Sequence, residues 1–441
     1  MADSYRVRSL KKPAQWTVEV PGSKSITNRA LLLSALCKGH VYLHGVLFSD
    51  DSRHFLSSLQ SLGYDVRIDE GQHTVELEGC GGVLPVQAGS IHVGSAGTAA
   101  RFLTAMLGVS EGTFVINASE QMQKRPMQPL FEALISLGAS VEWLGEAWHL
   151  PVRITGAGAQ IRSLEQEAVL NLDISTSTQF LSALLMMAPV LGEDFTIHIM
   201  SEKKDGSYIR ITRKLMEQFG VECNFDGDSY HIKKGQQYQR EVYEIEPDVS
   251  AACYFYAMAA INGGVAKAAH VHFDSSQGDV RFLRVLEKMG CTVTDEPDGI
   301  CLRGPEDGIL HGVDVVMSDF SDQTMTLAAT AVFAKGDTTI HGVAHIRRQE
   351  SNRMQAIVNE LTRLGISCEE TEDGLIIHPK TPKCSDENPV VIQTYEDHRM
   401  AMAFAVIGTK VPGIRINDPY CCRKTFENYF EWLTKLNLEL K

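Results

Sequence analysis

Residues 24–39 read KSITNRALLLSALCKG, a polar cluster followed by an apolar stretch of helical length and then by a glycine. The same order of residue types returns five more times, at intervals of roughly seventy to eighty residues, which is too long for an ordinary solenoid. The pattern predicts one supersecondary unit that is used six times. The other copies are SAGTAARFLTAMLG (95–108), STQFLSALLMMAPVLG (177–192), DVSAACYFYAMAAINGG (248–264), DQTMTLAATAVFAKG (322–336) and EDHRMAMAFAVIG (396–408).

Between the apolar stretches a second pattern returns, in which a Leu-rich amphipathic segment ends in glycine and an alternating run follows. Such a glycine commonly ends a helix, and alternation is typical of a strand, so each copy predicts a helix and then a strand. Segments that are apolar on every face belong in the interior. We therefore expect an α/β fold in which sheets wrap the most apolar helices. The copies stand at residues 54–68, 130–143, 215–225, 282–294 and 357–370.

Two similar stretches indicate where the chain changes domain. WTVEV (16–20) leads into Pro21, and VYEIE (242–246) leads into Pro247, so each alternating strand meets a proline and then a polar helix start. Three repeats lie between them. We expect one inserted domain at residues 21–246 (repeats 1–3) and a second domain at residues 1–20 plus 247–441 (repeats 4–6). Two adjacent crossings would form a hinge, with the helix starts of both halves facing a cleft.

Composition limits the classes of partner. The chain has 441 residues, 44% of them hydrophobic and 22% charged, which is enough for two large cores. A formal net charge of −14 argues against nucleic acid or an anionic membrane as the main partner, so any anion site must be local. Ten cysteines without a CxxC motif favour reduced thiols. The sequence contains no signal-like or membrane-spanning stretch, so we expect a cytoplasmic protein.

The unusual polar residues stand at the starts of the apolar stretches, where unpaired N–H groups and the helix dipole favour anions. In PGSKSITNRALLL (21–33), Lys24, Ser25 and Arg29 crowd into the first turns of an apolar helix. Basic residues oppose the dipole there, so a bound anion would explain them. The plainer interpretations are a solvated helix start or a fragment of a P-loop, although the spaced glycines of a P-loop are missing.

Four further clusters combine cations with other polar groups. Each also has a plainer interpretation: a surface basic pair, a surface ion pair, a structural histidine and a solvated lysine. The spacing in the second cluster predicts a helix in which Glu350 and Arg353 share one face. Carboxylates beside arginines are what acid–base chemistry on an anionic substrate requires. The clusters are QMQKRPMQP (121–129, with Lys124 and Arg125), RRQESNRM (347–354, with Arg347 and Arg348), TYEDHRMAM (394–402, with Asp397, His398 and Arg399) and DPYCCRKTF (418–426, with Lys424).

From Trp16 to the C-terminus the chain resembles the 5-enolpyruvylshikimate-3-phosphate (EPSP) synthase family. The resemblance implies two inside-out α/β domains, each of three βαβαββ repeats with buried helices, joined by a two-strand hinge. It also implies a monomeric transferase of the shikimate pathway, which leads to chorismate and the aromatic amino acids, with no metal and no cofactor. The motifs that carry it are PGSKSITNRALLL, GSAGTAARFL, KRP, STSTQFLSALLM, SYIRIT, DQTMTLAATA, QESNR, DHRMAM and KTF.

The reaction that the resemblance implies moves the enolpyruvyl group of phosphoenolpyruvate to the 5-hydroxyl of shikimate 3-phosphate and releases phosphate, through a tetrahedral intermediate. The implied catalytic residues are Asp322, which would accept the hydroxyl proton, Glu350 and Lys24, which would handle the methylene proton, and His398. The implied phosphoenolpyruvate-binding residues are Lys24, Gly97, Arg125, Gln179, Arg353, Arg399 and Lys424. The implied shikimate-3-phosphate-binding residues are Lys24, Ser25, Arg29, Ser177, Thr178, Gln179, Tyr208, Asp322, His345 and Gln349.

Three residues depart from the family pattern. Gln349 stands where many relatives have lysine, His345 where asparagine or a similar residue is usual, and Asp205 where a serine commonly binds the phosphate. Loss of an ammonium beside a phosphate removes a bond worth about 1.5–3 kcal/mol. Another cation would have to replace that charge. The candidates are Arg347, Arg348, Lys203 and Lys204.

Two other functions stay open on the sequence. A related enolpyruvyl transferase acts on UDP-N-acetylglucosamine, but that family carries KNAALP in place of KSITNR and a cysteine in the loop that here reads QMQKRP. The other alternative is a non-catalytic or altered-substrate paralogue, which the three departures would favour. Retention of the residues implied in catalysis argues against the paralogue.

Overall fold

A computed structural model describes residues 4–10, 13–162 and 166–439. The chain divides into two compact units, an inserted unit of residues 22–245 and a terminal unit of residues 1–21 with 246–441. Residues 1–3, 11–12 and 440–441 of the expected second domain and residues 163–165 of the expected inserted domain lie outside the described residues.

Two repeats of the inserted unit run continuously in sequence. Each has a parallel first pair of strands, and its last two strands add an antiparallel hairpin, in the orders β6-β7-β9-β8 and β10-β11-β13-β12. The second repeat consists of β6 (Ala88–His92), α3 (Gly97–Val109), β7 (Thr113–Asn117), α4 (Glu120–Gln123), α5 (Gln128–Ser136), β8 (Ser140–Trp143) and β9 (Val152–Thr155). The third consists of α6 (Gly158–Arg162), β10 (Ala168–Leu172), α7 (Gln179–Met187), η1 (Ala188–Leu191), β11 (Phe195–Ile199), α8 (Ser207–Gln218), β12 (Asn224–Phe225) and β13 (Ser229–Ile232).

The first repeat takes one strand from the far end of the unit. The chain enters this unit at Gly22, directly before α1. Among the described residues, therefore, no strand that belongs to this unit precedes that helix. β14 (Val242–Glu244) fills the place and pairs in parallel with β3, so the sheet order is β14-β3-β5-β4. The other elements are α1 (Lys24–Leu36), β3 (Lys38–His44), α2 (Asp50–Ser61), β4 (Val66–Asp69) and β5 (Thr74–Cys80).

The terminal unit repeats this design, with β2 (Gln15–Val18) completing the sheet β16-β17-β15-β2. The first strands of two repeats are therefore exchanged. β2 precedes α1 in sequence but belongs to the sheet of the fourth repeat, and β14 precedes α9 but belongs to the sheet of the first. The fourth repeat adds α9 (Val249–Asn262), β15 (Val265–Ala269), η2 (Gly278–Arg281), α10 (Phe282–Lys288), β16 (Thr292–Glu296) and β17 (Gly299–Arg303). The fifth has β19 (Asp314–Val316), η3 (Ser321–Gln323), α11 (Thr324–Ala331), β21 (Thr338–His341), η4 (Ala344–Arg348), α12 (Arg353–Arg363), β22 (Ser367–Glu370) and β23 (Leu375–His378), beside a small pair, β18 (Leu310–His311) and β20 (Ala334–Lys335).

The sixth repeat differs from the other five in detail. Its sheet has three strands, β1-β25-β24, and the N-terminal strand β1 pairs antiparallel with β25. In the other five repeats the helix after the second strand leads into a hairpin that pairs with that strand, whereas here β1 takes the place beside β25. The elements are β24 (Val390–Ile392), α13 (His398–Lys410), β25 (Ile414–Asn417), η5 (Pro419–Lys424), α14 (Tyr429–Glu439) and β1 (Ser4–Arg6).

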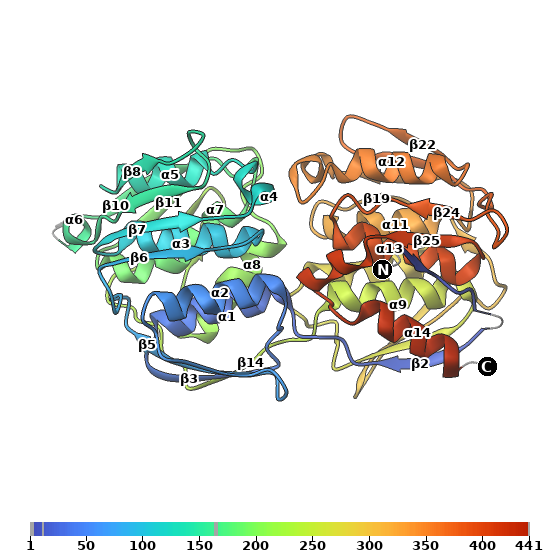
Figure 1. Cartoon of the computed structure of the whole chain (residues 1–441), viewed down its shortest axis with the longest axis horizontal. Helices are drawn as coiled ribbons and strands as arrows, with labels where there is room; N and C mark the ends of the chain where they lie inside the picture. Colours follow the sequence, from blue (N-terminus) through green and yellow to red (C-terminus); the bar gives the residue numbers. More distant parts are fainter. Residues whose placement is uncertain (1–3, 11–12, 163–165, 440–441) are drawn as a thin grey trace. The chain divides into compact units, whose positions relative to one another are not determined.

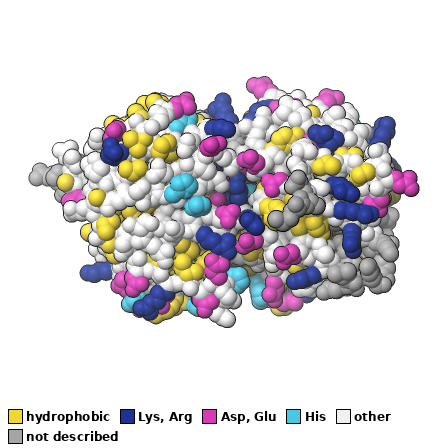
Figure 2. Space-filling view, viewed as in Figure 1, with side chains coloured by type: hydrophobic (Ala, Val, Ile, Leu, Met, Phe, Trp, Pro, Cys, Tyr) yellow, Lys and Arg dark blue, Asp and Glu magenta, His cyan; other side chains and the backbone are white. Residues whose placement is uncertain are grey.

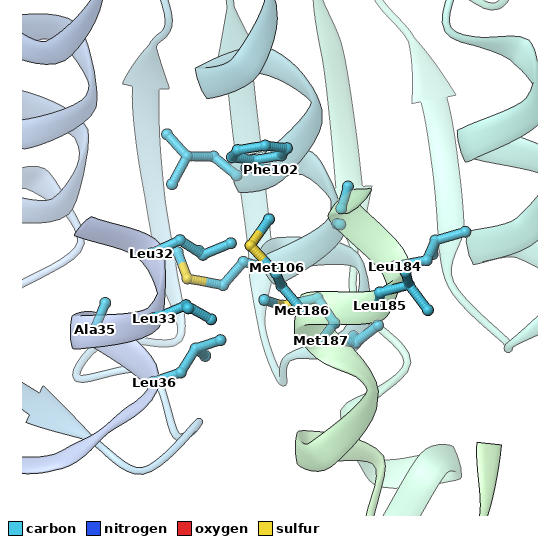
Figure 3. Close-up of a cluster of buried hydrophobic side chains, with 14 of the residues drawn as sticks. Leu32, Leu33, Ala35, Leu36, Phe102, Met106, Leu184, Leu185, Met186 and Met187 are labelled. Carbon is cyan, nitrogen blue, oxygen red and sulfur yellow. The ribbon is translucent and has the colours of Figure 1, made fainter. Parts of the chain in front are cut away.

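The six apolar segments form the inner helices, as predicted. Every residue of α3 and of α11 is buried, as are all but one of α7, α9 and α13. In the inserted unit, α3 packs against both α1 and α7 (Figure 1). Figure 3 shows Leu32 and Leu36 of α1, Met106 of α3 and Met186 of α7 pointing toward one another. Since these helices are apolar on all sides, their polar first turns are the places where the interior meets the surface.

The predicted succession of helix, glycine and strand is confirmed in all five copies. The glycines after α2, α5, α8, α10 and α12 have φ between 79° and 111°, a region that only glycine adopts without steric cost.

The surface of the molecule carries charges of both signs (Figure 2). Acidic and basic side chains alternate over the face drawn in Figure 2. All ten cysteines are free thiols. Among the described residues, no helix combines the length and apolar character that crossing a membrane requires.

Candidate functional site

In the inserted unit, the inner helices begin without acidic residues. The first turns of α1, α3 and α7 contain neither aspartate nor glutamate, so no side chain on those turns offsets the positive end of the dipole. At the start of α7, Ser177 Oγ accepts a hydrogen bond from the N–H of Gln179 at 3.2 Å, and Thr178 is the N-cap. These helix starts can hold an anion.

Three of the predicted residues meet at Gly97, the first residue of α3. A methyl group added to Gly97 would lie 3.0 Å from Arg125 Nη1 and 3.2 Å from Gln179 Oε1. It would also lie 2.7 Å from Nη1 of Arg101, which donates to Gly97 O at 3.1 Å. The structure therefore brings two guanidinium groups and an amide from three segments to one helix N-terminus. Sequence reasoning had not included Arg101.

Lys24 forms an ion pair that the sequence did not reveal. Its Nζ lies 3.2 Å from Oδ2 of Asp51, in the first turn of α2, and the two side chains are 16% and 5% exposed. The other carboxylate oxygen of Asp51 is buried without a hydrogen-bond partner among the described residues. In the sequence around Asp51, the one recognisable local pattern is the capping motif of Ser49 and Ser52. This motif fixes the start of α2 but does not indicate a contact with Lys24.

Arg29 is almost fully buried, at 1% exposure, and four hydrogen bonds hold its guanidinium. Its partners are Thr212 Oγ1 at 2.7 Å, Ser182 Oγ at 3.3 Å and the carbonyl oxygens of Ser25 and Tyr208 at 2.9 and 3.2 Å. The group also lies over the Phe102 ring, 5.2 Å from its centroid. Burial lowers the pKa of Arg29 to about 10, since all these partners are neutral. The arginine ties α1 to α7 and α8 and supports the residues beside it.

Asp205 stands before α8 and is committed to neighbours within the inserted unit. Its Oδ2 pairs with Arg210 Nη1 at 2.8 Å, and its Oδ1 accepts a hydrogen bond from Tyr230 Oη at 3.1 Å. Tyr208, in the first turn of α8, is half-buried.

In the terminal unit, Arg353 is the centre of a cluster of carboxylates. Its Nε donates to Asp397 Oδ2 at 2.8 Å, Nη1 to Asp322 Oδ1 at 2.9 Å and Nη2 to Glu350 Oε2 at 2.8 Å. Nη1 also contacts Gln349 Oε1. Burial lowers the pKa of this guanidinium, but the three carboxylates outweigh burial, so the net shift is upward. Arg353 is therefore a permanent buried cation.

Asp322 links two of the predicted cations. Its Oδ2 accepts a hydrogen bond from Arg399 Nη2 at 2.8 Å, while its Oδ1 is bound by Arg353. Asp397 caps α13, as predicted, by accepting from the N–H of Arg399 at 3.0 Å, and it is fully buried. Segments on η3, α12 and α13 thus bring Asp322, Arg353 and Arg399 together.

The prediction of a helix through residues 347–353 is wrong. α12 begins at Arg353, because Asn352 accepts a hydrogen bond from the N–H of Gln355 and acts as the N-cap. The segment from Gln349 to Asn352 is not helical. The predicted contact between Glu350 and Arg353 exists nevertheless, since the non-helical turn brings the two groups within 2.8 Å.

The remaining predicted residues of this unit surround the cluster or stand apart from it. His345 Nε2 shares a hydrogen bond with Ser321 Oγ at 2.9 Å, next to Asp322 in sequence. His398 is 1% exposed, and its Nδ1 lies 3.9 Å from Asp397 Oδ1. Lys424 ends η5 and is half-buried.

Two of the four candidate replacement cations have other partners. Arg347 donates to Glu370 Oε1 and to the carbonyl oxygens of Thr371 and Glu372, all within 2.9 Å. Lys204 Nζ donates to Ile199 O at 2.6 Å. Arg348 is exposed, and the Lys203 side chain lies over Gly206 at the start of α8. Among the described residues, no group of three or more His, Cys, Asp or Glu is placed to hold a metal ion.

The chain is similar to known proteins over almost its whole length. Residues 10–433 match the family model described as EPSP synthase (3-phosphoshikimate 1-carboxyvinyltransferase). The chain is 42% identical to a 3-phosphoshikimate 1-carboxyvinyltransferase of Trichormus variabilis, over 98% of this chain and 99% of that protein. It is 41% identical to one of Yersinia pestis, over 96% of each.

Solved structures share the fold. An EPSP synthase from Acinetobacter baumannii superposes with a TM-score of 0.79 at 24% identity, covering 98% of each chain. The enolpyruvyl transferase NikO from Streptomyces tendae superposes with a TM-score of 0.74 at 15% identity, covering 98% of this chain and 97% of that one. At these identities the likeness concerns the fold alone.

Proposed function

The chain belongs to the EPSP synthase family, and from that premise we propose how its own residues divide the work of the reaction. The protein is a transferase that moves the enolpyruvyl group of phosphoenolpyruvate to shikimate 3-phosphate and releases phosphate. The observation that carries the assignment of roles is the Asp322 carboxylate, held between the guanidinium groups of Arg353 and Arg399. A base beside two cations suits proton removal next to an anionic substrate.

For phosphoenolpyruvate the proposed ligands form two groups, one for the phosphate and one for the carboxylate. Arg125 and Gln179, which meet at Gly97, bind the phosphate together with Lys24 and Lys424. Two guanidinium groups suit a planar carboxylate, so Arg353 and Arg399 are assigned to the carboxylate of phosphoenolpyruvate.

The hydrogen bonds around Asp322 indicate how the substrate carboxylate would bind to Arg353 and Arg399. Arg353 and Arg399 already bind a carboxylate, that of Asp322. The substrate carboxylate would exchange with Asp322 for these donors. Asp322 would then lose two charge-assisted bonds and become a stronger base, so that binding of phosphoenolpyruvate activates it.

The chemical steps then follow in order. Asp322 accepts the proton of the 5-hydroxyl group of shikimate 3-phosphate. At the same time the oxygen of that hydroxyl group attacks C2 of phosphoenolpyruvate. Glu350, with Lys24, delivers a proton to C3, which becomes a methyl group in the tetrahedral intermediate. Removal of a proton from that methyl group re-forms the double bond as the C2–O bond to phosphate breaks. The pairing of Glu350 with Arg353 at 2.8 Å holds the carboxylate in place.

For shikimate 3-phosphate we propose the starts of α1, α7 and α8 in the inserted unit. The contacts from Ser25, Ser177, Thr178, Gln179 and Tyr208 are supported by the position of these residues in first turns or caps. Arg29 supports this surface through its hydrogen bonds to Ser25 and Tyr208.

Residues of the terminal unit complete the proposed set for this substrate. His345 and Gln349 are assigned to it with Asp322. Of the candidate replacement cations, Arg348 is preferred, because its side chain is exposed, whereas Arg347 and Lys204 bind other groups. His398 is assigned an influence on the reaction through Asp397, because its ring is buried beside that carboxylate.

Phosphate release tests the assignment. Purified protein is assayed with phosphoenolpyruvate and shikimate 3-phosphate, then with UDP-N-acetylglucosamine in place of shikimate 3-phosphate, and then with neither acceptor. We expect release only with shikimate 3-phosphate, and Asp322→Asn should reduce kcat by at least about 100-fold. Asp386→Asn, at an exposed carboxylate, is the control. Full activity of Asp322→Asn would remove Asp322 from the mechanism, whereas no release by the unaltered protein would favour the non-catalytic paralogue.

The cytoplasmic location and the monomeric state are also part of the proposal. Net charge of −14 and the free thiols support the location. A mass near 48.7 kDa in light scattering would support a monomer, and twice that mass would contradict it.

A further inference from the structure

We propose that Asp279 is a positioning residue for Asp322, because it fixes the neighbouring Gln323 side chain and places a second carboxyl group behind the base. The inference rests on the proposed role of Asp322 as acceptor of the hydroxyl proton. Asp279 lies on η2, is 6% exposed, and its Oδ1 accepts a hydrogen bond from Gln323 Nε2 at 2.8 Å.

The Gln323 side chain is fixed at both ends of its amide. Its Oε1 accepts a hydrogen bond from Thr326 Oγ1 at 2.9 Å, and its Nε2 donates to Asp279. Gln323 has no exposed surface, so the amide cannot turn toward solvent instead. Because Asp322 and Gln323 are consecutive residues of η3, fixing one restricts the other.

Hydrogen bonds also hold η2 itself in place. Gln277, directly before η2, accepts from the N–H of Val249 at 3.1 Å and donates to Pro247 O at 2.7 Å. The Cys253 thiol lies 3.7 Å from the carbonyl oxygen of Asp279. The start of α9 thus holds η2, and η2 holds η3. Through these contacts the position of α9 restricts the position of η3 and therefore of Asp322.

The charges around Asp279 give it a second effect. Asp322, Asp248, Arg399 and the Cys253 thiol all interact with it electrostatically. Burial and then the charge of Asp322 raise the pKa of Asp279 to about 6, although Arg399 and the Gln323 hydrogen bond act in the opposite direction. Interaction between two charges is mutual, so an ionised Asp279 makes Asp322 take up a proton more readily. It partly offsets Arg353 and Arg399, which favour the ionised form of Asp322.

The decisive experiment compares two variants with the unaltered protein over a range of pH. Asp279→Asn keeps an oxygen that can accept from Gln323 but removes the charge. Because Asp279 is ionised only above about pH 6, we expect kcat/KM of Asp279→Asn to differ from that of the unaltered protein above pH 6 and to approach it below, so that the shape of the pH profile changes. We also expect kcat at pH 7.5 to fall by roughly three- to tenfold, because the base is weaker. Thr326→Val loosens Gln323 without a change of charge and should leave the shape of the pH profile unchanged.

Two results separate failure of this inference from failure of the proposed function. If Asp279→Asn folds and gives the unaltered pH profile, Asp279 has no influence on the base and the inference is overturned. If Asp322→Asn keeps full activity, the proposed function of Asp322 fails instead. Should Asp279→Asn not fold, Gln323→Leu removes the two hydrogen bonds of the amide, to Asp279 and from Thr326, and keeps the carboxyl group of Asp279. Lower kcat at unchanged KM for both substrates would then support positioning, and an unchanged kcat would overturn it.

Discussion

The two units bury an arginine in opposite ways. Arg29 in the inserted unit and Arg353 in the terminal unit are both 1% exposed and both join helices that carry predicted site residues. Arg29 is surrounded by hydroxyl groups, carbonyl oxygens and a ring, whereas Arg353 is bound by three carboxylates. The pKa of Arg29 is accordingly lowered, and that of Arg353 is raised.

The difference separates two kinds of chemistry. Neutral partners leave the positive charge of Arg29 uncompensated, and the first turns of α1, α3 and α7 add the positive ends of three dipoles. Such a region attracts phosphate. The carboxylates around Arg353 cancel its charge and leave groups that can exchange protons. Repeats of one architecture thus become specialised through the partners of a buried cation.

The largest effect is expected from Arg353→Met. Loss of the cation would leave the buried carboxylate of Asp397 without its arginine and Asp322 with Arg399 alone, which costs about 3–5 kcal/mol, and activity should be abolished. Thermal unfolding measures the loss of stability. Arg6→Ala is the control, since the side chains of its ion pair with Asp386 are 55% and 52% exposed and such a pair contributes less than about 1 kcal/mol. Equal melting temperatures for the two variants would contradict the importance of the buried cluster.

A pH-dependent effect on stability is expected from Asp279 in the terminal unit. Because the folded protein raises the pKa of Asp279 from 3.8 to about 6, its contribution is full below pH 3.8 and is lost as pH rises through 6. The stability of Asp279→Asn relative to the unaltered protein should therefore increase by about 1–3 kcal/mol between pH 4 and pH 7. Melting temperatures across that range test the sign, with Asp386→Asn as an exposed control. A difference that decreases with pH would refute it.

A smaller loss is expected from Arg29→Met. The variant leaves Thr212, Ser182 and two carbonyl oxygens short of a donor but leaves no unpaired charge, so we expect a cost of about 1–3 kcal/mol. Chemical unfolding of Arg29→Met and Arg353→Met under the same conditions gives the comparison directly. If the two variants lose the same stability, the charge of the partners does not decide the cost of removing a buried arginine.

The smallest effect is expected from Gly97→Ala. Its new methyl group would press on Arg101, Arg125 and Gln179, whose side-chain ends can shift by a few tenths of an ångström. We expect KM for phosphoenolpyruvate to rise about tenfold, equivalent to about 1.4 kcal/mol, with little change in melting temperature. Gly71→Ala, at an exposed turn with room for a methyl group, is the control. A rise in KM for shikimate 3-phosphate alone would place the phosphate site of phosphoenolpyruvate elsewhere.

Local patterns in the sequence made much of the fold predictable. Apolar stretches of helical length gave the inner helices, and the five glycines gave the ends of the outer ones, because each signal depends on neighbouring residues. Asp397 was recognisable as a cap for the same reason. The start of α12 was predicted wrongly, because an i, i+3 spacing does not distinguish a helix from the turn that Asn352 caps.

The sequence alone determined which residue types stand at the helix starts, and with them the family and its reaction. Tertiary structure alone decided which of these groups are charge-balanced. Asp51 meets Lys24 from 27 residues away and Asp279 meets Gln323 from 44 residues away, and no local pattern announces either contact. The physical reason is that burial and pairing depend on distances across the fold, whereas a helix start depends on the few residues that surround it.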